Sequence, residues 1–447
     1  MQERFAIRRA HGLASTERPD PMGRAIAALT AVAGASALDR LHLRKPTERA
    51  LFLGTRAGFQ AIGATTSQAA RLRPRRASSG QGKPGGKSGL FDLTPTTDEQ
   101  LLVDAATEVA DGFFRTDAAA SDRARKATDL ALKSAAAVTG AVTLRAGQPA
   151  DVRTPMAATL VTEALARGDM GLAVAALATP AVATAVARWG TVGQQRLHLG
   201  RLTGHEPVAA ALVIAEPRPL FDATELQTTA TRQGKRFVLD GEKCGVVRGA
   251  EVEVFLVAAM LDGAPRLFLV DADTDGVETI DDPLMGLRAA ATSRLVLNGV
   301  AVDGTALLGS AEDYLECLTL SRLAWCALAV GTGRAALDHS IEFANAERDG
   351  GEPLSHHQGY AFLVSRMAME LEGMRLVTYK AASRATAGLS FTREVGLARR
   401  LCVEAGMTIG SDAVQLLGDS ALTGDYPVER WFRDLRAVGA MEGAVLV

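Results

Sequence analysis

Residues 412–443 hold most of the side chains in this chain whose types and spacing could perform chemistry. The segment reads DAVQLLGDSALTGDYPVERWFRDLRAVGAMEG, with Gln415 and Gly418 near its start and Glu442 near its end. A carboxylate in a dry pocket has a raised pKa and is suited to removing a proton from carbon. Glu442 is therefore a candidate general base. The alternative interpretation is a solvated glutamate close to the last residue.

The same segment resembles the acyl-CoA dehydrogenase family, whose members read QxxGGxG, then YPVExxxRD, then a Glu-Gly pair. The matching positions are Gln415, Gly418, Tyr426-Pro427-Val428-Glu429, Arg433-Asp434 and Glu442-Gly443. The resemblance extends from about Leu90 to the last residue. It implies that Glu442 removes the α-proton of an acyl-CoA thioester while FAD accepts the hydride from the β-carbon.

The resemblance also implies two strand-end motifs that hold the flavin ring, close to TEPxxGSD and WITN in the family. The first reads AEPRPLFD here, from Ala215 to Asp222, and the second reads GVVR from Gly245. On these positions the resemblance assigns Glu216 and Val247 to cofactor binding and Asp222 to substrate binding. The Thr, Gly and Ser of the first motif and the Trp and Thr of the second are replaced. Several polar contacts and one stacking surface are therefore missing.

The resemblance further implies that the FAD tail is held across a dimer interface. The matching positions are Arg348, Gln358, Gln415 and Gly418. The next glycine of the family motif is Asp419 in this chain. A carboxylate about 4 Å from a pyrophosphate would repel it by roughly 4 kcal/mol at an effective dielectric constant of about 20. Such repulsion lowers affinity by powers of ten unless Arg348 or another cation offsets it.

Three further groups of residues have both chemical and structural interpretations. Arg322 matches an arginine that faces the acyl-CoA site in relatives, or it is an ordinary helix cation. The pair His356-His357 is more typical of the solvated start of a helix than of an acid–base pair. Trp325 and Trp431 lie at helical spacing, which favours core positions over cofactor contacts.

The periodicity predicts the elements that must position these residues. Residues 90–207 read as an α-helical domain, with Thr96 and Glu99 as a capping box for a helix at about 98–116. Residues 208–311 read as a β-domain, in which Asp240-Gly241 predicts a hairpin turn. Residues 312–447 read as long helices, at about 315–346, 358–387, 392–417 and 428–438. The order predicts an α+β fold, and it matches the family's helical domain, central β-domain and C-terminal helical bundle.

The charge is unevenly distributed along the chain. The net charge is -2, but residues 1–87 hold 16 Lys and Arg against 5 Asp and Glu. We interpret residues 1–70 as a basic helical extension and residues 71–89 as a flexible linker. The extension docks on a partner protein or an anionic membrane surface, or it packs on its own body. Nucleic-acid binding is disfavoured because the basic cluster has no interleaved aromatic residues.

The composition limits the cellular setting. Hydrophobic residues make up 47% and aromatic residues 5% of the chain, which favours a helical core of Ala, Val and Leu. The four cysteines form no CxxC pair, which indicates reduced and mostly buried thiols in a cytoplasmic protein. By inspection no apolar run is long enough to cross a bilayer. Residues 25–37 imitate a signal peptide only weakly. Because of the basic extension, a location at a membrane surface is the alternative to a purely cytoplasmic one.

Two hypotheses about function follow. The first is an FAD-dependent acyl-CoA dehydrogenase that works as a homo- or hetero-oligomer and passes electrons to an acceptor. The second is a catalytically degenerate subunit that completes the site of an active partner. The spacing that leads to Glu442 favours the first hypothesis, and the altered flavin motifs favour the second. Family members continue with a further helix after the Glu-Gly pair, so the resemblance implies a bundle that is incomplete or completed by a partner.

Overall fold

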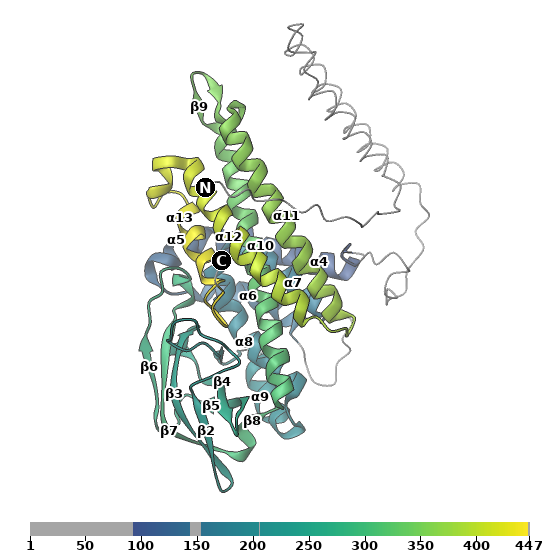
Figure 1. Cartoon of the computed structure of the whole chain (residues 1–447), viewed down its shortest axis with the longest axis vertical. Coiled ribbons are helices and arrows are strands. Elements are labelled where there is room, and N and C mark those ends of the chain that lie inside the picture. The colour runs from purple at the N-terminus through teal and green to yellow at the C-terminus, as the bar shows by residue number, and fades with distance from the viewer. Residues whose placement is uncertain (1–92, 144–152, 205, 446–447) are drawn as a thin grey trace, which may run out of the picture. The chain divides into compact units, whose positions relative to one another are not determined.

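The computed structural model of the chain describes residues 93–143, 153–204 and 206–445. The predicted extension and linker, residues 1–70 and 71–89, lie outside these residues. The described part consists of helices, then a β-sheet, then helices again (Figure 1). The α+β fold predicted from the sequence is therefore confirmed.

The first helical part begins where the sequence predicts. Thr96 accepts a hydrogen bond from the Glu99 N–H, and the Glu99 carboxylate accepts one from the Thr96 N–H, so the predicted capping box is present. Two later helices have simpler caps, in which one side-chain oxygen, of Thr154 or of Asp169, accepts a hydrogen bond from a backbone N–H of the first turn. The elements are α4 Thr97–Val109, the π-helical turn η1 Ala110–Phe114, α5 Arg115–Ala124, α6 Asp129–Val142, α7 Pro155–Gly168, α8 Met170–Trp189 and α9 Val192–Thr203.

The central part is an eight-stranded sheet at the lower left of Figure 1, with α9 beside it. Its hydrogen-bonded order is β6-β7-β3-β2-β4-β5-β8, and β1 pairs with β4 in parallel. The strands are β1 Ala210–Val213, β2 Thr229–Gln233, β3 Arg236–Val246, β4 Val254–Leu261, β5 Ala264–Asp271, β6 Val277–Asp281, β7 Ser293–Asp303 and β8 Leu307–Leu308.

The hairpin predicted at Asp240-Gly241 is wrong. β3 runs without a break through these residues, and its pairing with β7 changes register between Leu239 and Gly241, which marks a β-bulge. Gly241 has φ +146°, and a Cβ there would lie 2.7 Å from the Cα of Thr228. The hairpin turn instead falls at Gly234, where φ is +61°, between β2 and β3. The dipeptide correctly signals unusual backbone, but long-range pairing decides that it is a bulge.

The C-terminal part contains the long helices that the sequence predicts. Ser310 and Asp313 form a capping box at the start of the longest helix. The elements are α10 Ala311–Ala346, the short hairpin of β9 Arg348–Asp349 and β10 Glu352–Pro353, α11 Gln358–Thr386, α12 Thr392–Leu417, the 3₁₀ turn η6 Gly418–Leu422 and α13 Val428–Ala437.

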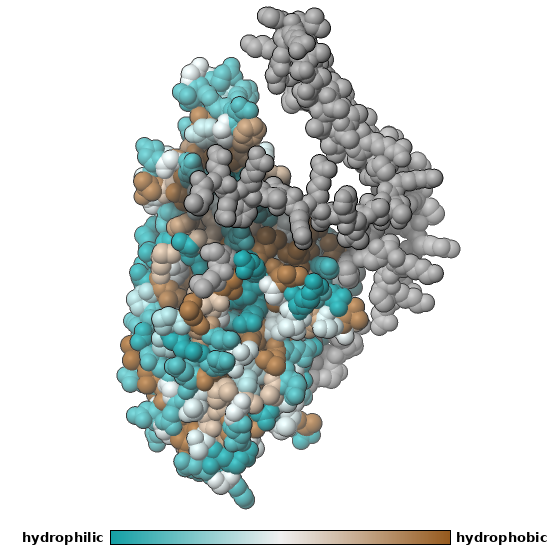
Figure 2. All heavy atoms as spheres, in the orientation of Figure 1, coloured by the Kyte–Doolittle hydropathy of each residue, from teal (hydrophilic) through white to brown (hydrophobic). Residues whose placement is uncertain are grey.

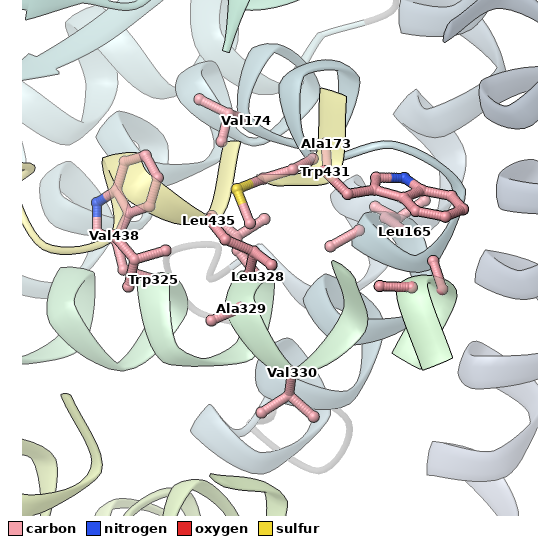
Figure 3. Packing of buried hydrophobic residues seen from close by; sticks show 14 of the residues in the cluster. Leu165, Ala173, Val174, Trp325, Leu328, Ala329, Val330, Trp431, Leu435 and Val438 are labelled. Atoms are coloured by element: carbon pink, nitrogen blue, oxygen red, sulfur yellow. The ribbon is translucent and has the colours of Figure 1, made fainter. Parts of the chain in front are cut away.

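One hydrophobic core joins the two helical parts. Figure 3 shows side chains from α7, α8, α10 and α13 meeting in it. Trp325 is 5% exposed and Trp431 is 6% exposed, so both tryptophans are core residues, as predicted. The four cysteines are unpaired, and three of them are buried. This core fixes α10 relative to α13 and to the segment that follows α13.

Two helices are long and apolar enough to cross a membrane by length and composition, contrary to the expectation from the sequence. They are α8 and α10, with mean hydropathy of 1.8 and 1.2 over their most apolar windows. Within the described structure, 61% and 67% of these windows are buried inside the protein. Their apolar character is therefore used in the core of the fold.

The contact between α10 and α7 depends on a glycine. A Cβ at Gly331 would lie 2.1 Å from the backbone oxygen of Glu163. We expect Gly331→Ala to lower the free energy of unfolding by about 1–3 kcal/mol, because the two helices must separate. The matched control is Gly396→Ala on α12, where the added methyl meets nothing within 4 Å. That change should raise stability by up to about 1 kcal/mol. Urea denaturation measures both, and equal effects would contradict the prediction.

Candidate active site

The residues after α13, Ala440 to Val445, form a tight turn that we call the C-terminal strap. Glu442 has φ +62° and Gly443 has φ +115°. A side chain at residue 443 would be unfavourable for two reasons. Its backbone conformation is one that residues other than glycine rarely adopt, and a Cβ there would lie 2.8 Å from Nη2 of Arg322. The Ala444 N–H donates to the Phe221 oxygen at 2.9 Å, which ties the strap to the β-domain.

Two arginines, of which Arg399 is buried and Arg322 is half-buried, donate hydrogen bonds to three consecutive carbonyl groups of the strap. Arg322 of α10 donates to the Glu442 oxygen from Nε at 3.0 Å and from Nη2 at 2.7 Å. Arg399 of α12 donates from Nη2 to the Gly443 oxygen at 2.6 Å and also to the Met441 oxygen. Because backbone carbonyls accept these bonds, the carboxylate of Glu442 is left to face the interior.

Glu442 is 7% exposed, and its carboxyl lies beside one face of α10. Burial raises the pKa of Glu442 above its usual value, while Ser321, Arg399, Trp325 and Arg322 oppose the rise. Its Oε2 atom is buried and has no hydrogen-bond partner in the described structure. A buried carboxylate with a raised pKa has the properties of a general base.

A groove of about 200 Å³ lies on the α10 side of this carboxylate. It is lined by one face each of α7, α8 and α10, mainly with apolar and small side chains. Ala158, Ala185 and Ala324 leave the space open where larger residues would fill it. Cys317 and Ser321 of α10 belong to its wall and also lie close enough to Glu442 to interact with it electrostatically. The groove suits an apolar chain whose reacting end lies near Glu442.

A second cavity, of about 380 Å³, lies on the β-domain side of the strap. Its walls come from the ends of β1 and β3, the loop at Leu284, α13 and the strap. Met441 and Ala444 are among its lining residues, and Glu442 lines neither cavity. We call the second cavity the slot. Chain neighbours of Glu442 line the slot, and Cys317 and Ser321, which interact with its carboxyl, line the groove, so Glu442 lies between the residues of the two spaces.

Glu216 lies at the slot, but protein donors already occupy its carboxylate. The side chain is 4% exposed and accepts from the Gln227 N–H at 2.8 Å and from Nζ of Lys243 at 3.0 Å. Thr228 donates to it from both its N–H and its hydroxyl group. These contacts hold the end of β1 against β3. The predicted role of Glu216 in cofactor binding stays a prediction.

The other predicted residues of the β-domain and α10 lie around the strap. Asp222 is exposed, and its carboxylate accepts two hydrogen bonds from Thr224, which lower its pKa. Val247 is half-buried and packs against the helical core, and it is absent from the lining of the slot. Arg322 contacts the strap directly, by donating to the backbone oxygen of Glu442. The ligand roles of Asp222, Val247 and Arg322 remain predictions.

The residues assigned to the FAD tail are exposed on the helical bundle. Arg348 lies in the β9–β10 hairpin and donates to the Gly351 oxygen at 3.1 Å. Gln358 begins α11, and Gln415 and Gly418 lie at the end of α12. Figure 1 shows the β9 hairpin at the top of the view, far from the strap near the label C. One copy of the chain thus does not bring these residues to Glu442.

The two adjacent histidines lie outside the site. His356 and His357 are exposed at the start of α11, as the sequence predicts, and Nδ1 of His356 lies 2.9 Å from the Glu352 carboxylate.

The Arg433-Asp434 pair of the motif serves the fold. Arg433 donates to the Asp122 carboxylate at 3.1 and 2.9 Å and to Glu429 at 2.7 and 2.9 Å. Asp434 accepts from the Leu287 N–H at 2.6 Å. These bonds tie α13 to α5 and to the β-domain, and so fix where the strap begins.

Sequence reasoning missed Arg399. It is one of two adjacent arginines in a helix, and only the buried face on which it lies distinguishes it from Arg400. Its position on the apolar side of α12 was the available signal, because an arginine among buried positions needs a specific partner.

Comparison with known proteins agrees with this architecture. The family models for the acyl-CoA dehydrogenase middle domain and C-terminal domain match residues 211–300 and 312–445. The chain is 32% identical over 288 residues to a probable acyl-CoA dehydrogenase, YngJ, of Bacillus subtilis (strain 168), covering 62% of this chain and 75% of that protein. It is 29% identical over 296 residues to a short-chain-specific acyl-CoA dehydrogenase of Megasphaera elsdenii, covering 64% and 77%.

Solved structures give the same result. Butyryl-CoA dehydrogenase from Megasphaera elsdenii superposes with a TM-score of 0.73 at 26% identity, covering 79% of this chain and 96% of that one. Glutaryl-CoA dehydrogenase from Mycobacterium smegmatis superposes with a TM-score of 0.71 at 25% identity, covering 78% and 92%. The two family models cover the chain from β1 into β7 and from α10 into the strap, and the chain belongs to the acyl-CoA dehydrogenase family.

Proposed function

We propose that this chain is an FAD-dependent acyl-CoA dehydrogenase that introduces an α,β double bond into an acyl-CoA thioester. The observation that carries the proposal is the position of Glu442, buried between an apolar groove and a slot at the ends of β1 and β3. In this arrangement the acyl chain lies in the groove between α7, α8 and α10. Glu442 takes the α-proton, and its raised pKa makes it a stronger base than a solvated carboxylate.

The slot supports FAD as the cofactor. Its lining includes Ala215, Gly245, Gly286 and Ala444, whose small side chains let a planar ring approach the backbone. Arg436 also lines the slot and pairs with no carboxylate among the described residues, so a cation is available for an anionic group. When bound, FAD supplies the hydride acceptor for the β-carbon. The residues of this chain orient it and separate it from water.

We infer an oligomer, homomeric or with a related chain, that passes electrons to a separate acceptor. Arg348, Gln358, Gln415 and Gly418 are exposed in one copy, which is consistent with a tail that a second subunit helps to hold. Apolar side chains on α11 are exposed as well, and Figure 2 shows hydrophobic patches that interrupt the hydrophilic surface.

Asp419 should weaken FAD binding if Gln415 and Gly418 hold the pyrophosphate. It is exposed and follows Gly418 directly. We expect Asp419→Asn to tighten FAD binding about tenfold at low salt, because one repulsive charge is removed. Titration of the flavin-free protein with FAD, followed by flavin fluorescence, measures the affinity. Added salt should shrink the difference.

The control for this change is Asp425→Asn, another exposed aspartate that follows the same helix. It should leave the affinity unchanged. Equal FAD affinities for wild type and Asp419→Asn at low salt would contradict a tail site at the end of α12.

The visible absorption spectrum of the purified chain tests the proposal. It is recorded for the chain alone and after co-expression with a related acyl-CoA dehydrogenase chain. Bound flavin in the lone protein, bleached on addition of acyl-CoA, supports the proposed activity. A chain that is yellow only in the complex indicates a shared site. The second candidate, a degenerate subunit, is favoured by the replaced flavin motifs, and absence of flavin in both samples would support it.

A further inference from the structure

Arg399 is a buried cation without a carboxylate in direct contact. Its side chain is 4% exposed, and it forms no salt bridge within the described part of the chain. One nitrogen, Nη2, donates to two strap carbonyls, while Nε and Nη1 are buried and have no hydrogen-bond partner. Buried arginines normally pair with an acid, because an isolated buried charge is costly. The charge of Arg399 therefore needs an anion nearby.

The anion that interacts with Arg399 is Glu442. Each of the two residues shifts the ionisation of the other, and both have a buried polar atom with no partner. The other ionisable side chains that act on either group are a tyrosine, cysteines and an arginine, and none of them is a carboxylic acid. They are Tyr314, Cys317, Arg322 and Cys326 of α10 and Cys402 of α12. Asp222 of the β-domain interacts with Arg322.

Arg399 and Arg322 approach the strap from different helices and hold different atoms. Arg322 holds the carbonyl of Glu442 itself, and Arg399 holds the carbonyls on both sides of it. The backbone of Glu442 lies in a left-handed conformation, which a non-glycine residue keeps only when its surroundings fix it. Arg399 thus holds the backbone on both sides of Glu442 and also acts on the charge of its carboxylate.

We propose that Arg399 is the positioning residue of the base, fixing the strap on both sides of Glu442 and balancing the buried carboxylate with its own charge. The assignment of Glu442 as the base rests on the proposed function. The coupling of the two charges does not, because it concerns the folded protein alone.

The coupling predicts how stability depends on pH. Burial raises the pKa of Glu442 above the usual value of a glutamate side chain. A carboxyl group with a raised folded-state pKa contributes stability that is fully present below the unfolded pKa and is lost as pH rises through the folded pKa. Removal of the Arg399 charge raises the pKa of Glu442 further. The decline in stability should then extend to higher pH.

Urea denaturation between pH 5 and 9 tests the proposal with four proteins, each with and without Glu442→Gln. They are wild type, Arg399→Met, Arg399→Lys and the matched control Arg400→Met on the exposed face of α12. The difference caused by Glu442→Gln at each pH isolates the titration of Glu442. We expect Arg399→Met to move that titration upward by about one pH unit. Arg399→Lys and Arg400→Met should keep the wild-type titration.

Identical titration of Glu442 in wild type and Arg399→Met would overturn the proposal. So would a change in the pH dependence of stability that Arg399→Met causes equally in proteins that already carry Glu442→Gln. If Arg399→Met fails to fold, recovery of folding by Arg399→Met with Glu442→Gln supports it. If both fail, Arg399→Gln takes the place of Arg399→Met, because glutamine is neutral and can still donate to a strap carbonyl. An upward shift of the Glu442 titration then upholds the proposal, and an unshifted one overturns it. The measurements need neither flavin nor acyl-CoA, so their outcome is separate from the fate of the proposed activity.

Discussion

Replacement of Glu442 with Gln is expected to slow reduction of the bound flavin by acyl-CoA by roughly 10² to 10⁴-fold. The amide cannot accept the α-proton, while its size and shape keep the strap in place. Flavin content should be unchanged, because Glu442 does not line the slot. Stopped-flow bleaching of the flavin band measures the rate, and the absorption spectrum before mixing measures the flavin content.

The control for this experiment is Glu404→Gln, a glutamate on the exposed side of α12. It should react like wild type. Normal turnover by Glu442→Gln, alone or in complex, would rule out Glu442 as the base. In the wild type the rate should rise with pH through the raised pKa of Glu442, because only the deprotonated carboxylate accepts a proton.

Replacement of Lys243 with Met should lower the free energy of unfolding by about 3–5 kcal/mol. Lys243 is 0% exposed, and Nζ lies 3.0 Å from the Glu216 carboxylate and 3.1 Å from the Ile214 oxygen. Burial lowers the pKa of Lys243 to about 8, with Glu216 opposing the shift, so the ammonium group persists at neutral pH. Methionine removes the ammonium group that is hydrogen-bonded to the buried carboxylate, and the remaining cation is Arg218, whose Nε lies 3.6 Å from Glu216.

The matched control is Lys235→Met in the exposed turn between β2 and β3, which should change stability by less than about 0.5 kcal/mol. Addition of Glu216→Gln to Lys243→Met should recover part of the loss, because no unpaired charge is then buried. Urea denaturation at pH 7 measures all three proteins. A cost below about 1 kcal/mol for Lys243→Met would show that the pair is not the main support of this strand end.

Gly245 and Met441 pack against each other beside Glu442. A Cβ at Gly245 would lie 3.3 Å from the sulfur and the terminal methyl of Met441. Gly245 stands at the tryptophan position of the second flavin motif, so a larger side chain there would require Met441 to move. The sequence shows that the tryptophan is replaced, and only the structure shows that Met441 occupies the space beside residue 245.

The sequence alone determined the family, the α+β order and most of the long helices. These features depend on local patterns, because a capping box such as Thr96 with Glu99 or a helical apolar stripe is made by neighbours in the chain. The spacing from Tyr426 to Glu442 also identified the candidate base before any contact was known. Helix periodicity reports which side is apolar, and this suffices to place Trp325 and Trp431 in the core.

The tertiary structure decided what depends on partners far apart in the chain. Whether Asp240-Gly241 is a turn or a bulge depends on how β3 pairs with β7, and α8 and α10 are core helices because other elements cover them. The role of Arg399 depends on carbonyls 42 and 44 residues away. The raised pKa of Glu442 arises from desolvation, which only the packed surroundings create. The sequence identifies the carboxylate, and the fold buries it and raises its pKa.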